Sequence, residues 1–233
     1  MSNMANGKII DEFVLKFQKA GDMTNEERLR LFDDFIQNNP DNKFVVEFYD
    51  AWGKFYDQDM SHVKFTSADD CLNEVKRRFP MFKTLRILDV GSGTGEGGKK
   101  LFDAGYTNID GCDGSTGMLE VAKRRNVYRN VYHEFVTEQP MKHVPAGAYD
   151  LIVSSGVFTP QHLHGVHLKT VLACAKKGGM LIISGNPYND EGVNMRPAIK
   201  QLVEANSIEV IEHRQLLNWW RDHDGFLLVL KRL

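Results

Sequence analysis

Three glycines that alternate with other residues give this chain a stretch of main chain that could contact a ligand directly. Gly91, Gly93 and Gly95 follow the short, mostly apolar run 86–90. Glycine has no Cβ atom, so it can adopt φ angles that other residues avoid and lets a ligand approach the backbone closely. A loop of this kind that opens a helix also offers N–H donors at the positive end of that helix. The pattern predicts a cofactor-binding turn between a strand and a helix.

The spacing of these glycines distinguishes two classes of cofactor. Dinucleotide-binding turns favour G-x-G-x-x-G, whose third glycine would stand at position 96, and this chain has Glu96 there. A carboxylate at that point would repel a diphosphate, whereas S-adenosylmethionine carries an ammonium and a sulfonium group and no phosphate. The spacing G-x-G-x-G, with Asp89 two residues before it, therefore favours S-adenosylmethionine. An NAD-dependent oxidoreductase is the weaker alternative.

A second acidic residue follows at a distance that suits a nucleoside. Asp113 stands 22 residues after Gly91, in the sequence Asp-Gly-Ser at the end of the second predicted strand. A carboxylate at the edge of the sheet can accept hydrogen bonds from both ribose hydroxyls. The same carboxylate would fit NAD, and an Asp-Gly pair is also common in turns. The glycine spacing, and not Asp113, therefore favours S-adenosylmethionine over NAD.

These motifs resemble those of class I S-adenosylmethionine-dependent methyltransferases. Leu-Asp-Val-Gly-Ser-Gly-Thr-Gly at 88–95 is similar to the first motif of that family, and Asp-Gly-Ser-Thr-Gly-Met-Leu at 113–119 is similar to its D-x-S-x-x-M-L stretch. Tyr-Asp-Ala-Trp-Gly at 49–53 and Gly-Val-Phe-Thr at 156–159 resemble a smaller subgroup, the Williams-Beuren syndrome region methyltransferase-like proteins. The resemblance covers most of 44–233. It implies methyl transfer from S-adenosylmethionine to an acceptor that the subgroup does not identify.

The resemblance also implies which residues contact this cofactor. The glycine loop would hold the methionyl group, Asp89 its ammonium directly or through water, and Asp113 the ribose. Met118 would pack on the adenine, and polar groups after the third strand would face the adenine amine. Two tyrosines at helical spacing would line the pocket, where an aromatic face beside a sulfonium contributes roughly 0.5–2 kcal/mol; these tyrosines and Met118 would also suit an ordinary core. The expected cofactor-binding residues are Tyr49, Tyr56, Asp89, Gly91, Ser92, Gly93, Thr94, Gly95, Asp113, Gly114, Met118, Thr137, Glu138 and Ser155.

Three histidines follow the fourth predicted strand, at the mouth of the expected pocket. A neutral imidazole at His162 could accept a proton from an amine or hydroxyl as it is methylated, so His162 is the candidate catalytic residue. His164 and His167 stand one helical turn apart, but no acidic or thiol ligand lies near them in sequence, so no metal site is predicted. Capping or surface positions are the simpler explanation for all three. Asn-Pro-Tyr at 186–188 is expected to form a turn, with a substrate contact as the alternative.

The elements that must position these residues alternate in type after residue 85. Short apolar or β-branched runs alternate with amphipathic runs, an order typical of a doubly wound α/β fold with a parallel sheet. The resemblance implies a seven-stranded, mostly parallel, Rossmann-like methyltransferase sheet whose last strand is antiparallel. We expect strands at 86–90, 107–112, 130–135, 149–154, 179–184, 207–212 and 226–231, and helices at 97–104, 116–125 and 163–177.

The first eighty residues are expected to be mostly helical. Thr24 and Glu27 form a capping-box pattern ahead of an amphipathic run that ends near residue 40. Further helices are expected at 44–55 and 68–79. We therefore expect residues 1–80 to form a helical lid and residues 81–233 to form the cofactor-binding domain. The lid and the loop near 186–196 would bound the acceptor site, and Trp219-Trp220, between the last two strands, would cover the sheet edge.

Composition narrows the class of partner. The chain has 233 residues with 29 basic and 31 acidic side chains, a net charge of −2, so it lacks the broad basic surface that favours double-stranded nucleic acid. No run reaches the roughly 18 apolar residues of a membrane span, and the N-terminus lacks a signal-peptide pattern. A cytoplasmic location is expected, which suits three widely spaced, reduced cysteines. The expected acceptor is a small molecule, the oligomeric state is open, and a cofactor-binding module without turnover is the alternative to an enzyme.

Overall fold

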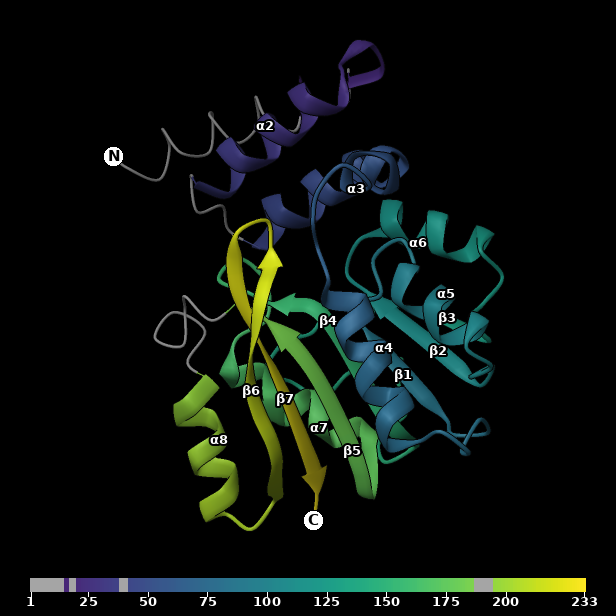
Figure 1. Cartoon of the computed structure of the whole chain (residues 1–233), viewed down its shortest axis with the longest axis vertical. Helices are drawn as coiled ribbons and strands as arrows, with labels where there is room; N and C mark the ends of the chain where they lie inside the picture. The colour runs from purple at the N-terminus through teal and green to yellow at the C-terminus, as the bar shows by residue number, and fades with distance from the viewer. Residues whose placement is uncertain (1–14, 17–19, 38–41, 187–194) are drawn as a thin grey trace.

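A seven-stranded sheet forms the centre of the part of the chain that the computed structural model describes, residues 15–16, 20–37, 42–186 and 195–233 (Figure 1). The strand order is β3-β2-β1-β4-β5-β7-β6, and β7 runs antiparallel to both of its neighbours. This topology confirms the expected doubly wound, mostly parallel sheet. The strands are β1 Ile87–Val90, β2 Ile109–Asp113, β3 Asn130–His133, β4 Tyr149–Phe158, β5 Ala175–Gly185, β6 Ile208–Trp220 and β7 His223–Arg232.

The first strand lies in the middle of the sheet, between β2 and β4, because its sequence is mostly apolar on both faces. All four of its residues are buried, and Asp89 is paired in register with Gly111 on one side and Val153 on the other. A parallel strand that is covered on both faces favours a continuous apolar run. The carboxyl ends of β1, β2 and β4 consequently meet at one edge of the sheet, where a doubly wound fold binds its ligand.

Helices cover both faces of the sheet. On one face, α4 Ser67–Arg78 and α5 Glu96–Asp103 pack through Cys71, Val75 and Leu101. On the other, α7 Leu168–Cys174 follows the 3-10 turn Gly165–His167 and packs beside α8 Met195–Glu204. A further helix, α6 Thr116–Arg124, follows the N-cap Ser115, whose Oγ accepts a hydrogen bond from Met118 N at 3.1 Å. Among the helices of the described ranges, none is long and apolar enough to cross a membrane.

Two N-terminal helices lie above the carboxyl ends of the strands (Figure 1). The 3-10 turn Ala20–Asp22 leads into α2 Asn25–Gln37, and α3 Asn42–Met60 follows. The predicted capping box of α2 is confirmed, because Glu27 N donates to Thr24 Oγ1 at 3.3 Å and Thr24 N donates to Glu27 Oε2 at 2.7 Å.

A buried ion pair joins these two helices. Arg28 of α2 donates to both carboxylate oxygens of Asp59 of α3, at 2.7 and 2.8 Å, and both side chains are almost fully buried. Asp59 Oδ2 also accepts from Trp52 Nε1 at 2.8 Å. An apolar cluster that includes Phe35 and Phe48, whose rings stack at 4.1 Å, surrounds this contact. The two helices therefore behave as one packed unit above the sheet.

The described elements differ from the sequence-based expectation in three places. The helix expected at 163–177 ends at Cys174, because Ala175 already pairs with Tyr149 as β5 begins. Strand β6 continues to Trp220 because it forms a long hairpin with β7, so the two tryptophans lie in the strand and not between strands. The helix α4 falls within the expected lid segment but packs on the sheet, so the helices above the sheet end at Met60. Residues 187 and 188 of the expected turn, and residues 1–14, 17–19 and 38–41 of the expected lid, lie outside the described residues.

Candidate functional site

The glycine loop after β1 has the backbone conformation that its glycines predict. The φ angles are +69° at Gly91, +53° at Gly93 and +87° at Gly95. A Cβ at Gly91 would lie 2.3 Å from a methyl group of Val157, whereas a Cβ at Gly93 would project into open space. Gly91 N donates to Cys112 O at 2.9 Å, so the loop lies against the end of β2. The first glycine is therefore required by packing, and the second leaves space for a ligand beside the backbone.

Asp113 links this loop to the next turn. Its Oδ2 accepts from Gly93 N at 2.9 Å and its Oδ1 accepts from Ser115 N at 2.8 Å. Burial raises the pKa of the Asp113 carboxyl, while these two backbone N–H groups lower it. Each carboxylate oxygen keeps a further lone pair, and Asp113 lines the cavity described below. The carboxylate thus holds the loop in shape and can still accept hydrogen bonds from a ligand.

Asp89 lies behind the loop and is 1% exposed. Its Oδ2 accepts from the Tyr128 hydroxyl at 2.7 Å. Burial raises the pKa of Asp89 to about 6, the Tyr128 hydrogen bond lowers it, and nearby Asp113 raises it. Asp89 is absent from the described linings of the cavities at this edge of the sheet. Its expected role toward an ammonium group would therefore act through the loop or through water.

The helix α3 is fastened to the cofactor loops by two carboxylates. Asp50 Oδ1 accepts from Ser115 Oγ at 2.6 Å and from Gly117 N at 2.8 Å, and Asp57 Oδ1 accepts from Thr94 Oγ1 at 2.6 Å. The two aspartates stand seven residues apart, so they lie on one face of the helix. Sequence reasoning missed both residues. Their only local signal was an acidic pair at two-turn spacing.

Two further contacts fix this docking. A Cβ at Gly53, between the aspartates, would lie 2.7 Å from the carbonyl carbon and oxygen of Gly117, so α3 and α6 touch backbone to backbone. Arg125 Nε donates to Thr94 O at 2.7 Å and its guanidinium pairs with Asp57 at 2.6 Å. The Arg125 guanidinium also lies 3.2 Å from the Glu96 carboxylate, so the negative charge beside the glycine loop is balanced by an ion pair.

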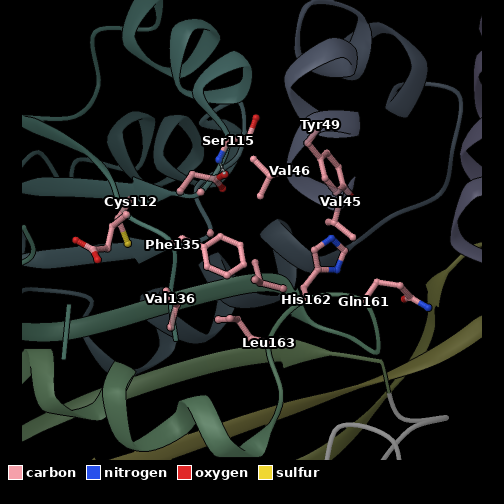
Figure 2. Close-up of a pocket in the computed structure, with 15 residues that line it drawn as sticks. Val45, Val46, Tyr49, Cys112, Ser115, Phe135, Val136, Gln161, His162 and Leu163 are labelled. Carbon is pink, nitrogen blue, oxygen red and sulfur yellow. Dashed lines mark hydrogen bonds between the residues drawn. The ribbon is translucent and has the colours of Figure 1, made fainter. Parts of the chain in front are cut away.

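Three adjoining cavities lie at this edge of the sheet, and they define the site. The cofactor cavity, of about 580 Å³, lies over the ends of β2 and β3, where Figure 2 shows the Phe135 ring facing Tyr49 and His162. The central pocket is lined by Tyr49, Tyr56, Asp113, Met118, Ser155 and His162, among others. The outer cavity, of about 1050 Å³ including its open mouth, lies between α2, α3 and the end of the β6–β7 hairpin. The structure thus brings together predicted residues from α3, β2, α6 and β4.

The glycine loop also borders a fourth cavity on the side of α5. Ser92, Gly93, Thr94 and Ser155 line it. Ser92 Oγ is buried and has no hydrogen-bond partner in the described ranges. A buried hydroxyl without a partner costs free energy, so it indicates a ligand that would complete it. Together with the open space at Gly93, this hydroxyl fits a cofactor with a polar end at the loop and an adenosyl end at Asp113.

The third strand contributes different residues from those expected. Thr137 and Glu138 are exposed and do not appear in the described lining of the cofactor cavity. Phe135 and Val136, directly before them, line it together with Glu134. The Phe135 ring packs against Gly114, where a Cβ would lie 2.7 Å from it. The wall of the cofactor cavity after β3 is therefore mainly apolar, and it begins three residues earlier than the residues expected to face the adenine.

His162 occupies the junction of the three cavities. Its Nδ1 lies 2.5 Å from Thr159 Oγ1, and its ring lies 5.4 Å from the Tyr49 ring. Burial, together with a smaller effect of neighbouring His164, lowers the pKa of His162 to about 4, so the imidazole is neutral at physiological pH. His164 N donates to His167 Nδ1 at 2.9 Å, which makes these two residues helix caps. Across the described residues, no three metal-ligating side chains gather into a cluster.

The two tyrosines of α3 complete the central pocket. Their ring centroids lie 6.3 Å apart, and burial raises the pKa of both hydroxyls. Nearby Asp113 raises both values as well. Tyr49 and Tyr56 thus line one pocket together with Asp113, and their contact with the cofactor stays a prediction.

Comparisons with known proteins agree with this geometry. Residues 87–179 match the family model described as a methyltransferase domain. The chain is 32% identical to human methyltransferase-like protein 27 over 123 residues, which is 52% of this chain and 49% of the human protein. The chain thus spans about half the length of that relative.

Solved structures share the fold over most of the chain. A chain of the Haloferax volcanii Trm112 methyltransferase activator complex has a TM-score of 0.62 at 17% identity, covering 81% of this chain and 97% of its own length. Burkholderia thailandensis 1,6-didemethyltoxoflavin-N1-methyltransferase, solved with 1,6-didemethyltoxoflavin and S-adenosylhomocysteine, has a TM-score of 0.57 at 14% identity, covering 82% and 85%. Residues 87–179, which carry the glycine loop and Asp113, thus match a methyltransferase domain, and the strand order is the Rossmann-like methyltransferase fold.

Proposed function

We propose that this protein transfers a methyl group from S-adenosylmethionine to a small molecule held in the outer cavity. The observation that carries this proposal is the position of the central pocket, which borders both the cofactor cavity and the outer cavity. It shares Asp113 and Val157 with the cofactor cavity, Tyr56 and Phe65 with the outer cavity, and His162 with both. A donor bound in the cofactor cavity and an acceptor bound in the outer cavity would therefore meet in the central pocket.

When bound, the cofactor supplies an electrophilic methyl group: the carbon–sulfur bond breaks with its electrons returning to sulfur, and the acceptor forms the new bond and releases a proton. The chain itself aligns the reactants and excludes water. Alignment of two reactants is worth on the order of 7–11 kcal/mol in well-oriented models, so few catalytic side chains are needed. The faces of Tyr49 and Tyr56 would stabilise positive charge in the central pocket.

We propose that His162 takes the released proton. Its Nδ1 is engaged with Thr159, and its Nε2 makes no hydrogen bond to any described residue. A base whose pKa is about 4 accepts a proton only from a group that has become acidic, as an amine or hydroxyl does while its bond to the methyl group forms. Replacement of His162 by glutamine should lower kcat by roughly 10²–10⁴-fold with an unchanged dissociation constant for S-adenosylhomocysteine. An unchanged kcat would remove this role.

Two measurements test the function itself. Calorimetry compares S-adenosylhomocysteine with NAD, and micromolar binding of NAD alone would refute the proposal. Labelled-methyl transfer into extract from cells that lack the gene then tests turnover. Labelled product supports an enzyme, and its absence, with S-adenosylhomocysteine still bound, supports a cofactor-binding module without turnover. Sizing the product distinguishes a small molecule from protein or RNA.

We also infer that the chain belongs with the Williams-Beuren syndrome region methyltransferase-like proteins. The similarity to human methyltransferase-like protein 27 supports this assignment. The Tyr-Asp-Ala-Trp-Gly stretch of α3, which resembles that subgroup, supports it as well. Asp50 and Gly53 of this stretch dock the helix on α6 and its N-cap.

A further inference from the structure

The outer cavity has an unusually aromatic wall. Besides the two tyrosines it shares with the central pocket, five aromatic side chains line it: Phe32, Trp52, Phe65, Trp219 and Trp220. Phe65 stands edge-on to Trp219 at 5.1 Å and to Trp220 at 5.2 Å, and the Phe32 and Trp52 centroids lie 4.8 Å apart. Rings from α2, α3, the segment after α3 and β6 thus surround one space. Aromatic walls favour a flat, aromatic occupant through stacked and edge-to-face contacts.

One polar atom of this wall has no hydrogen-bond partner among the described residues. Trp219 is 3% exposed, and its indole Nε1 is buried without a hydrogen-bond acceptor among the residues that the structure describes. The ring is held in place by Phe65 on one side and by Gly225 on the other, where a Cβ would lie 2.4 Å from it. A buried N–H without an acceptor is unfavourable and is rare in native proteins. A ligand with an acceptor atom would satisfy it.

The charges of the cavity cancel one another. Apart from histidines, the only charged residues in its described lining are Asp33 of α2 and Arg221 of the turn after β6. They form a bidentate ion pair with N···O distances of 3.0 and 3.1 Å. The guanidinium also lies 5.3 Å from the Trp220 ring. No unbalanced charge in this lining would attract an ionic group, so the cavity suits an uncharged molecule.

We propose that the acceptor is an uncharged, planar aromatic molecule with two polar ends, an inference that rests on the proposed methyl transfer. At one end, a hydroxyl or amino group on the ring lies in the central pocket near His162 and Tyr49. At the other, a carbonyl oxygen or ring nitrogen accepts from Trp219 Nε1. In the reaction the ring hydroxyl or amine forms the bond to the methyl carbon, the carbon–sulfur bond breaks, and the acceptor's proton passes to His162 or water.

Three bicyclic probes test this assignment by calorimetry on protein saturated with S-adenosylhomocysteine. 7-Hydroxycoumarin has a phenol and a carbonyl, 2-naphthol has the phenol alone, and decahydro-2-naphthol is its saturated counterpart. We expect 2-naphthol to bind at least tenfold more tightly than decahydro-2-naphthol. We expect 7-hydroxycoumarin to bind about fivefold more tightly than 2-naphthol, as one hydrogen bond predicts.

Two variants locate the hydrogen bond. Trp219→Phe should abolish the advantage of 7-hydroxycoumarin over 2-naphthol, whereas Trp220→Phe, the matched control from the same wall, should keep it. The chain has three tryptophans, and all three line the outer cavity, so quenching of their fluorescence by 7-hydroxycoumarin reports occupancy of that cavity. The ratio of two affinities within one variant is insensitive to a modest loss of stability.

The outcomes separate this inference from the proposed function. Tight binding of S-adenosylhomocysteine with no preference for aromatic over saturated probes would overturn the inference and leave methyl transfer standing. An equal coumarin advantage in both variants would overturn the role of Trp219. Failure of S-adenosylhomocysteine to bind would overturn the proposed function. The probes would then be titrated into the protein alone, and the outer cavity should still bind 2-naphthol more tightly than decahydro-2-naphthol and 7-hydroxycoumarin more tightly than 2-naphthol.

Discussion

Replacement of Gly53 by alanine should destabilise the protein, although alanine is the better helix former. A Cβ at this position in α3 would lie 2.7 Å from backbone atoms of Gly117 in α6. Carbon atoms pack at about 3.5–4.0 Å, so the two helices would separate by roughly 1 Å. Overpacking costs about 1–3 kcal/mol, and backbone atoms cannot rotate aside, so a cost of about 3 kcal/mol applies. The helix preference of alanine offsets about 1 kcal/mol, which leaves a net loss of about 2 kcal/mol.

Thermal unfolding followed by circular dichroism measures this loss. In a chain of this length a loss of 1 kcal/mol lowers Tm by about 2–4 °C, so we expect a fall of about 4–8 °C. Gly21→Ala is the control, because a Cβ there meets no atom within 4 Å and Tm should not fall. Since Tyr49 and Tyr56 flank Gly53 on α3, the affinity for S-adenosylhomocysteine should fall several-fold as well. A higher Tm for Gly53→Ala would show that helix preference dominates and would refute the backbone contact.

Three further predictions concern buried charges. Asp113→Asn places an amide N–H₂ against one of two backbone N–H donors, so calorimetry should show at least tenfold weaker S-adenosylhomocysteine binding, and an unchanged affinity would remove the residue from the site. Because burial raises the pKa of Asp89 to about 6, the carboxyl is neutral below that pH and anionic above it. The affinity of the protein for the cationic S-adenosylmethionine should therefore rise from pH 5 to 7. An equally steep rise in the Asp89→Asn variant would contradict this role of Asp89. Arg28→Met leaves Asp59 buried without its cation, so the free energy of unfolding should fall by about 3–5 kcal/mol, and a fall below about 1 kcal/mol would show that the pair contributes little.

The sequence was sufficient for features that depend on local pattern. The buried strand Ile87–Val90, the three positive-φ glycines and the position of Asp113 all follow from residue type and spacing within about 25 residues. The doubly wound, mostly parallel sheet with an antiparallel last strand followed from the alternation of strand and helix together with the family resemblance. These features are set by periodicity and by steric limits on the backbone, which a single sequence displays.

Features that depend on contacts distant in sequence were not predictable in this way. The aromatic wall joins Phe32 to Trp220, and Asp50 bonds Gly117 across 67 residues. Phe135, and not Thr137 or Glu138, lines the cofactor cavity because β3 ends at His133 and the Phe135 ring packs against Gly114, a contact that periodicity does not encode. Orphaned atoms such as Trp219 Nε1 also become visible only when every neighbour is in place.

The ion pair between Asp33 and Arg221 brings together residues that lie 188 positions apart. During synthesis the segment 87–179, with β1, β2 and the glycine loop, emerges well before the hairpin that supplies Trp219 and Arg221. The nascent chain can therefore form the nucleoside-binding half first, while the enclosure for the second reactant is completed only after β6 and β7 have left the ribosome. Variation confined to α2 and the β6–β7 hairpin would change the lining of the outer cavity without altering the glycine loop or Asp113.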